Sequence, residues 1–217
     1  MIVELGHYAL ILALLVAALQ GVLPMAGAAT GNWHWQSLAR PAAITQFLLV
    51  SLSFAALAYA FQVNDFSVLY VAEHSNTRLP VMYRFAAIWG GHEGSLLLWL
   101  ELLAIWTVSV ALFSRQMPLA MVARVISVLG LISAGFLLFV LTTSTPFERL
   151  FPVPFEGKDL NPLLQDPGLV IHPPMLYMGY VGFPWHLLLP SPLCWPGGWT
   201  WPGPGGRAPG RWWPGCF

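Results

Sequence analysis

One histidine, His172, stands directly before two prolines in the segment DLNPLLQDPGLVIHPPMLYMGYVGF, residues 159–183. A neutral imidazole can serve as an axial metal ligand, and a residue that precedes proline favours an extended backbone. An apolar stretch follows from Pro174 onward. The pattern therefore predicts an exposed ligand at the edge of an apolar helix. The alternative interpretation is a polar anchor at the start of that helix.

A second segment, WGGHEGS at residues 89–95, places two glycines between a tryptophan and a histidine. Glycine lets the backbone approach a neighbour closely, and tryptophan suits the boundary between membrane and water. His92 and Glu93 are adjacent and would point in different directions on a helix, so we favour a structural or site-lining role over metal ligation. The two segments supply these candidates for lining a site: Trp89, Gly90, Gly91, His92, Glu93, Pro173, Pro174 and Tyr177.

Glu101 lies about two turns inside an apolar segment. An ionised carboxylate at that depth in a bilayer costs a few kcal/mol unless it is paired or near water, so Glu101 is a further candidate for lining a site. The alternative is a protonated or snorkelling glutamate near the headgroups. We interpret His74 as a polar loop residue, and we assign no residue a catalytic role.

The elements that must position these residues are membrane helices. Hydrophobic residues make up 57% of the chain and charged residues 8%, with a mean hydropathy of +0.68, which is too apolar for a soluble domain. The net charge is zero, so no basic surface indicates nucleic-acid binding. Four segments can each cross a hydrocarbon core of ~30 Å, at residues 6–28, 42–63, 95–113 and 125–142. We predict an all-α integral membrane protein, in which a fifth span begins at Pro174 and fails near Phe183.

The connecting segments predict an orientation. The short loops 29–41 and 114–124 contain arginine but no acidic residue, whereas the long loops 64–94 and 143–173 carry both motifs and most of the acids. The density of basic residues therefore favours a cytoplasmic location for the short loops and a periplasmic one for the motif loops. We expect residues 65–84 to form short interfacial helices packed against the bundle. In the segment 161–166, Pro162 suits the first position of a capped helical turn.

Residues 184–217 differ from the rest of the chain. Of these 34 residues, 8 are proline, 7 are glycine and 6 are tryptophan, and both cysteines lie among them. Proline at this density is incompatible with a helix. Loss of one nucleotide after the Phe183 codon would explain the composition, because a shifted reading can restore an apolar span. We predict that 1–183 is a membrane region and that 184–217 is a disordered, frameshifted tail. A genuine proline- and tryptophan-rich tail is the alternative.

Residues 1–183, and the two motif segments above all, resemble the CcmF/NrfE/CcsA-type family of cytochrome c-type biogenesis proteins, membrane haem lyases of the bacterial inner membrane. The resemblance implies haem b as cofactor and His172 as one of two periplasmic axial ligands to haem iron. Members of this family take haem from a periplasmic haem chaperone and join it to apocytochrome c by thioether bonds, together with other cytochrome c maturation membrane subunits. The second histidine, the tryptophan-rich haem-handling segment and two membrane histidines of the family would lie beyond Phe217. We therefore expect this chain to be inactive alone.

Two other interpretations stay open. A membrane transporter or channel subunit would use Glu101 and His92 to line a polar path across the bilayer. That interpretation predicts internal repeats or broken helices, and the two halves of the sequence show no repeat. The other interpretation is a purely structural membrane subunit.

Overall fold

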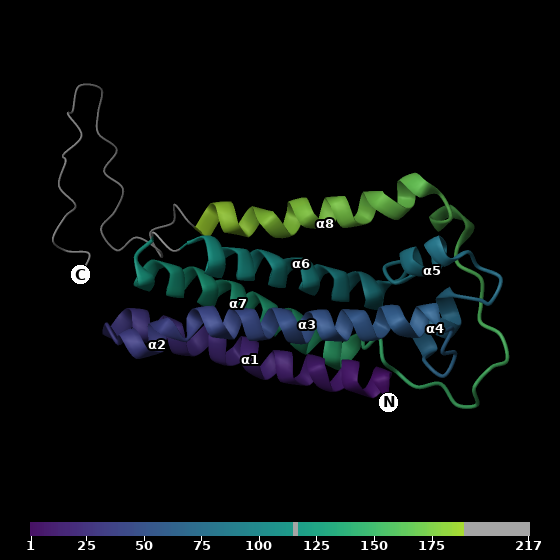
Figure 1. Ribbon diagram of the computed structural model, residues 1–217, viewed down its shortest axis with the longest axis horizontal. Helices are drawn as coiled ribbons and strands as arrows, with labels where there is room; N and C mark the ends of the chain where they lie inside the picture. The colour runs from purple at the N-terminus through teal and green to yellow at the C-terminus, as the bar shows by residue number, and fades with distance from the viewer. Residues whose placement is uncertain (115–116, 189–217) are drawn as a thin grey trace, which may run out of the picture.

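A computed structural model of the protein (Figure 1) describes residues 1–114 and 117–188, with the backbone alone for 163, 169 and 181–188. The helices of its central bundle are α1 (Ile2–Thr30), α3 (Ala39–Gln62), α6 (His92–Phe113) and α7 (Leu119–Thr143). The short helix α2 (Trp33–Ser37) leads directly into α3. The stretches 2–30, 33–62, 92–113 and 119–143 are long and apolar enough to cross a membrane. The predicted all-α fold with four complete spans is confirmed.

The four central helices form a bundle in which α1 packs against α3 and α7, and α6 packs against the same two helices. Small side chains line the inward faces of α1 and α3, where Ala13, Ala17, Ala43 and Ala56 are all buried. Small residues let membrane helices approach closely, which is the main source of their attraction in lipid. A last helix, α8 (Pro167–Leu188), lies along α6 on the outside of the bundle (Figure 1).

The connections that carry the motifs gather at one end of the bundle, opposite α2 (Figure 1). They contain α4 (Leu69–His74), α5 (Val81–Ala87) and the 3-10 turn η1 (Pro162–Leu164). Tyr70 and Val71 of α4 are buried in the core, and Leu164 N donates to the Asn161 carbonyl at 2.8 Å. The predictions of short packed helices within 65–84 and of a helical turn at Pro162 are confirmed.

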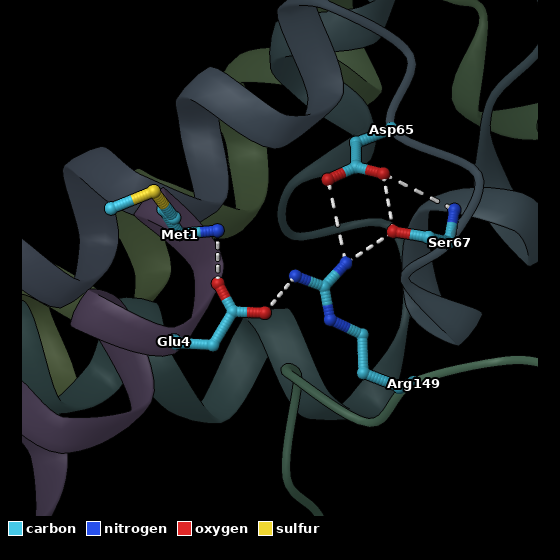
Figure 2. A network of polar contacts seen from close by, with 5 residues as sticks. All are labelled: Met1, Glu4, Asp65, Ser67 and Arg149. Carbon is cyan, nitrogen blue, oxygen red and sulfur yellow. Dashed lines mark hydrogen bonds and ion pairs between the residues drawn. The ribbon is translucent and has the colours of Figure 1, made fainter.

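The two long loops bind each other through their backbones. Leu150 N donates to Ser67 O and Leu69 N donates to Glu148 O, each at 2.9 Å. Between these bonds, the Arg149 guanidinium contacts the carboxylates of Glu4 and Asp65 and the hydroxyl of Ser67 (Figure 2). Because exposed ion pairs contribute little stability, we assign this cluster a role in alignment. It joins the start of α1 to both loops.

The predicted start of the fifth apolar segment is wrong, whereas its incompleteness as a membrane span stays a prediction. Helix α8 begins at Pro167 instead of Pro174 and continues past Phe183 to Leu188, so His172, Pro173 and Pro174 lie inside the helix. The start is explained by the Asp166–Pro167 pair. The Asp166 carboxylate accepts the Gly168 N–H at 2.8 Å as an N-cap does, and proline is favoured at the first helical position. The cap at Asp166 therefore starts a helix that includes His172, although a residue before proline, such as His172, usually has an extended backbone. The predicted tail, with Cys194 and Cys216, lies outside the described residues from 189 onward.

The orientation can be tested by labelling single cysteines from outside the cell, after Cys194 and Cys216 are replaced by serine. Three exposed side chains are suitable for replacement by cysteine. Arg78 and Lys158 lie at the end of the bundle where the motif-carrying connections gather, and His34 lies on α2 at the other end. The variants are Arg78→Cys, Lys158→Cys and His34→Cys. We expect an impermeant maleimide to label the first two in intact spheroplasts and His34→Cys only after the membrane is permeabilised. Labelling of His34→Cys alone in intact spheroplasts would reverse the orientation.

The contact between Glu156 and Thr77 predicts a pH dependence. The Thr77 N–H and hydroxyl donate to the two carboxylate oxygens at 2.8 and 2.7 Å, and these bonds hold the pKa of Glu156 below its ordinary value of 4.5. Because the folded protein has the lower pKa, the stabilisation is present above pH 4.5 and is lost as the pH falls through the lowered value. The protection of the Thr77 amide, which is its exchange rate compared with the intrinsic rate at the same pH, should therefore fall below pH 4.5.

The matched variants for that experiment are Glu156→Gln, which should remove the pH dependence, and Glu148→Gln, which alters an exposed carboxylate of the same loop and should keep it. Equal acid sensitivity of Thr77 exchange in all three proteins would contradict the role given to Glu156.

Candidate functional site

The two motif segments meet at a hydrogen bond between Trp89 and Val170. In a regular helix the Val170 carbonyl would accept the N–H of residue 174, but Pro174 has none. The Trp89 indole Nε1 donates to this carbonyl oxygen instead, at 3.2 Å. A side chain from the first motif thus satisfies a backbone group that the second motif leaves without its helical donor, two residues from His172.

Aromatic contacts extend this junction along α6 and α8. The Trp99 and Tyr177 rings meet edge to face, with centroids 5.2 Å apart, and Phe85 packs edge-on against Trp89 at 5.4 Å. Such pairs add about 0.5–1.5 kcal/mol beyond the area that they bury. The indole hydrogen bond holds α8 near Val170 against the turn before α6, and the Trp99–Tyr177 pair holds it near Tyr177 against α6 itself.

His172 is exposed on α8 and heads an apolar stripe. Residues three, four and seven positions later share its helix face; they are Met175, Leu176 and Gly179, which are all exposed. Among the described residues, no atom outside the backbone of α8 itself lies within 4 Å of where a Cβ of Gly179 would stand. This face offers one nitrogen donor beside exposed apolar side chains. That donor set fits one side of a flat, apolar macrocycle with a metal at its centre.

No group of three or more His, Cys, Asp or Glu side chains within the described part of the chain could hold a metal ion. A metal bound at His172 would therefore need a ligand set completed by its own cofactor or by another chain segment. Of the site residues predicted from the sequence, Trp89, Pro174 and Tyr177 lie at this junction. Trp89 bonds α8 before His172, and Pro174 and Tyr177 follow His172 on α8.

His92 and Glu101 contact other helices. His92 opens α6, and its Nδ1 lies 3.2 Å from the Ser144 hydroxyl at the end of α7. Glu101 faces α3, where the Ser51 hydroxyl donates to its Oε1 at 2.8 Å. Its second oxygen, Oε2, is buried without a partner among the described residues. The structure therefore links Glu101 to α3, whereas Trp99 on α6 and Trp89 in the turn before α6 contact α8.

The turn from Ile88 to Gly94 is shaped by Tyr70, which the sequence analysis did not select. The Tyr70 hydroxyl accepts the Gly91 N–H and donates to the Ile88 carbonyl, each at 3.0 Å. Burial raises the pKa of Tyr70 above its ordinary value, so the hydroxyl stays protonated and can make both bonds. Glycines in the motif signal a close approach, but one sequence does not identify the partner.

The junction predicts a coupling between Trp89 and Pro174. Trp89→Phe removes the donor to the Val170 carbonyl and should lower the free energy of unfolding by roughly 0.5–1.5 kcal/mol, the usual range for such a bond. Pro174→Ala restores a helical N–H to the same carbonyl, so Trp89→Phe should cost less in that background. Unfolding in mixed detergent micelles measures all four proteins.

Trp99→Phe is the matched control, because Trp99 contacts α8 through Tyr177 and does not bond Val170. Its cost should be the same in the unaltered chain and in the Pro174→Ala background. The junction as described would be wrong if Trp89→Phe had equal costs in both backgrounds.

Comparison with known proteins assigns the chain to a protein family. The model of the family "Cytochrome C assembly protein" matches residues 89–190, which include both motifs. The chain is 60% identical over 184 residues to the cytochrome c-type biogenesis protein CcmF of Pseudomonas aeruginosa and 55% identical to that of Escherichia coli K12, and each alignment covers 84% of this chain and 28% of the relative. The NrfE protein of Haemophilus influenzae is 47% identical over 183 residues, which are 84% of this chain and 29% of that relative.

A solved structure described as cytochrome c haem lyase CcmF superimposes with a TM-score of 0.74 at 27% sequence identity, over 85% of this chain and 29% of that one. This chain thus spans less than a third of the length of these relatives. The family model covers both motifs, and the superposition covers most of the fold. The chain belongs to the CcmF/NrfE cytochrome c assembly family, as a homologue of the N-terminal part of its members.

Proposed function

We propose that this chain forms the N-terminal membrane region of a cytochrome c assembly protein, in which His172 is an axial ligand to haem iron. The observation that carries the proposal is the exposed imidazole at the head of the apolar stripe on α8. A neutral imidazole donates a lone pair to iron, and Met175 and Leu176 offer apolar contact to a porphyrin face. Bound haem would supply the groups that form thioether bonds with cysteine thiols.

The residues around His172 orient the ligand. Trp89 holds the Val170 carbonyl one half-turn before His172, and Tyr177 contacts Trp99 one turn after Pro174. We propose that Pro173 and Pro174 stiffen this turn and that Gly90 and Gly91 keep the opposing backbone close. His92, Glu93 and Glu101 are proposed as further lining residues of the haem path.

The proposed setting is a bacterial inner membrane with both motif loops in the periplasm. Haem would arrive from a periplasmic haem chaperone, and the acceptor would be apocytochrome c, with other cytochrome c maturation subunits completing the assembly. Because the chain spans about 28% of its relatives' length, we propose that haem attachment requires parts of the family architecture that this chain does not supply.

The transporter interpretation has less support. It predicts broken spans near the bilayer midplane, whereas α1, α3, α6 and α7 each run as one helix through the described residues. The buried Glu101 oxygen is the observation that favours a polar path. A single carboxylate hydrogen-bonded to Ser51 is equally suited to joining α6 to α3.

Haem titration of the purified chain in detergent tests the role of His172. We expect a Soret change whose midpoint concentration rises about tenfold in His172→Ala, because the iron loses its protein ligand, and is unchanged in His34→Ala. His34 is the matched control, since it is an exposed histidine at the other end of the bundle. Equal titrations of His172→Ala and the unaltered chain would reject His172 as a ligand.

The spectrum itself tests the proposed incompleteness. With one axial histidine, reduced haem on the monomeric chain should give a five-coordinate, high-spin spectrum, and thioether attachment to apocytochrome c should not occur. A stable six-coordinate, low-spin spectrum that requires His172 in the monomer would show a second ligand within this chain and would contradict the proposal.

A further inference from the structure

The 88–94 turn of the first motif is built on one side chain of α4. Tyr70 is 4% exposed, and its hydroxyl bonds the Gly91 N–H and the Ile88 carbonyl, on opposite sides of the turn. These two groups have no helical partner, since α5 ends at Ala87 and α6 begins at His92. The hydroxyl therefore fixes the path of the backbone that leaves α5 and enters α6.

His74 and two glycines make this fit close. The His74 ring packs on Tyr70 with centroids 4.6 Å apart, and its Nδ1 lies 3.0 Å from the Tyr70 carbonyl oxygen. A Cβ on Gly91 would stand 2.6 Å from His74 Nε2 and 2.8 Å from Tyr70 Cε2. A Cβ on Gly94 would stand 2.6 Å from the Tyr70 hydroxyl and 1.6 Å from the Ile88 carbonyl oxygen. Any side chain at either glycine would push the turn off the Tyr70–His74 pair.

Trp89 leaves this turn and reaches α8. The Trp89 carbonyl accepts the Ser95 hydroxyl at 2.9 Å, which ties the start of the turn to α6. The Trp89 indole donates to the Val170 carbonyl. A displacement of the turn would move the indole, because a side-chain hydrogen bond tolerates only a few tenths of an ångström in length. The backbone near His172 would then lose its donor.

We propose that Tyr70 is a positioning residue for His172, acting through the 88–94 turn and the Trp89 indole. The importance of the position of His172 rests on the proposed function, whereas the coupling from Tyr70 to Trp89 does not involve haem. Among the described residues, the hydrogen bonds and ring contacts of Tyr70 are with Phe61, His74 and the backbone of residues 87–91. Its effect is transmitted by packing and by two successive hydrogen bonds.

The test uses the full chain in lipid nanodiscs, labelled with 5-fluorotryptophan. The Trp89 fluorine resonance is assigned by its loss in Trp89→Phe. In Tyr70→Phe it should shift, and the solvent-exchange rate of the Trp89 indole N–H should rise about fivefold, as expected for loss of one hydrogen bond. Tyr59→Phe is the matched control, because Tyr59 is half exposed on α3, and it should leave the resonance in place.

A second variant approaches the turn from the other side. Gly91→Ala keeps the Tyr70 hydroxyl but places a methyl group against the rings of His74 and Tyr70, and it should move the same resonance. Circular dichroism selects folded samples, so a general loss of structure is not mistaken for repositioning. If Trp89 is unchanged in folded Tyr70→Phe and Gly91→Ala, the positioning role is wrong.

Haem titration of the same samples separates the inference from the proposed function. Positioning predicts that Tyr70→Phe weakens His172-dependent binding about fivefold, with Tyr59→Phe unchanged. If haem binding requires His172 but ignores Tyr70, the inference fails and the proposed function stands. If Trp89 moves in Tyr70→Phe while His172→Ala leaves haem binding intact, the proposed function fails and the structural coupling stands.

Discussion

The structure depends on one backbone group, the Val170 carbonyl. Pro174 removes the N–H that would bond it within α8, and a carbonyl without a partner costs roughly 1–3 kcal/mol where water is excluded. The Trp89 indole supplies the missing donor at 3.2 Å. This replacement of an intrahelical bond by one from the turn before α6 couples the segment 172–174 to the WGGHEGS segment. It also makes the location of α8 depend on the exact path of the turn before α6.

The other features of the motif end serve the same geometry. The Tyr70 hydroxyl and the glycines at 91 and 94 fix the turn that carries Trp89. The backbone bonds between 67–69 and 148–150 hold the long loops together, so the chain enters α8 from a defined point. The apolar stripe after His172 then faces away from the bundle. A ligand on this face would be presented by the helix with little freedom, which suits a group that must meet a cofactor in one orientation.

The spans and the short helices of 65–84 were predictable because they follow from composition and length. The start of α8 was missed for a local reason, since the Asp166–Pro167 cap lies upstream of the prolines that drew attention to His172. The role of Tyr70 could not be predicted, because its contact with Gly91 depends on how α4 packs beneath the turn. The same holds for the Ser51–Glu101 bond, which requires the register between α3 and α6. Motif residues were thus identifiable from their types, but their partners were not.

The hydrogen bond between Trp89 and Val170 can be observed at the carbonyl itself. Only two valines in the sequence precede isoleucine, Val125 and Val170, so labelling valine carbonyls with ¹³C and isoleucine nitrogens with ¹⁵N isolates two carbonyl resonances by NMR. Val125 lies within α7 and serves as an internal reference. The account predicts that Trp89→Phe moves the Val170 resonance and leaves that of Val125 in place. Two resonances at the same positions in both proteins would contradict it.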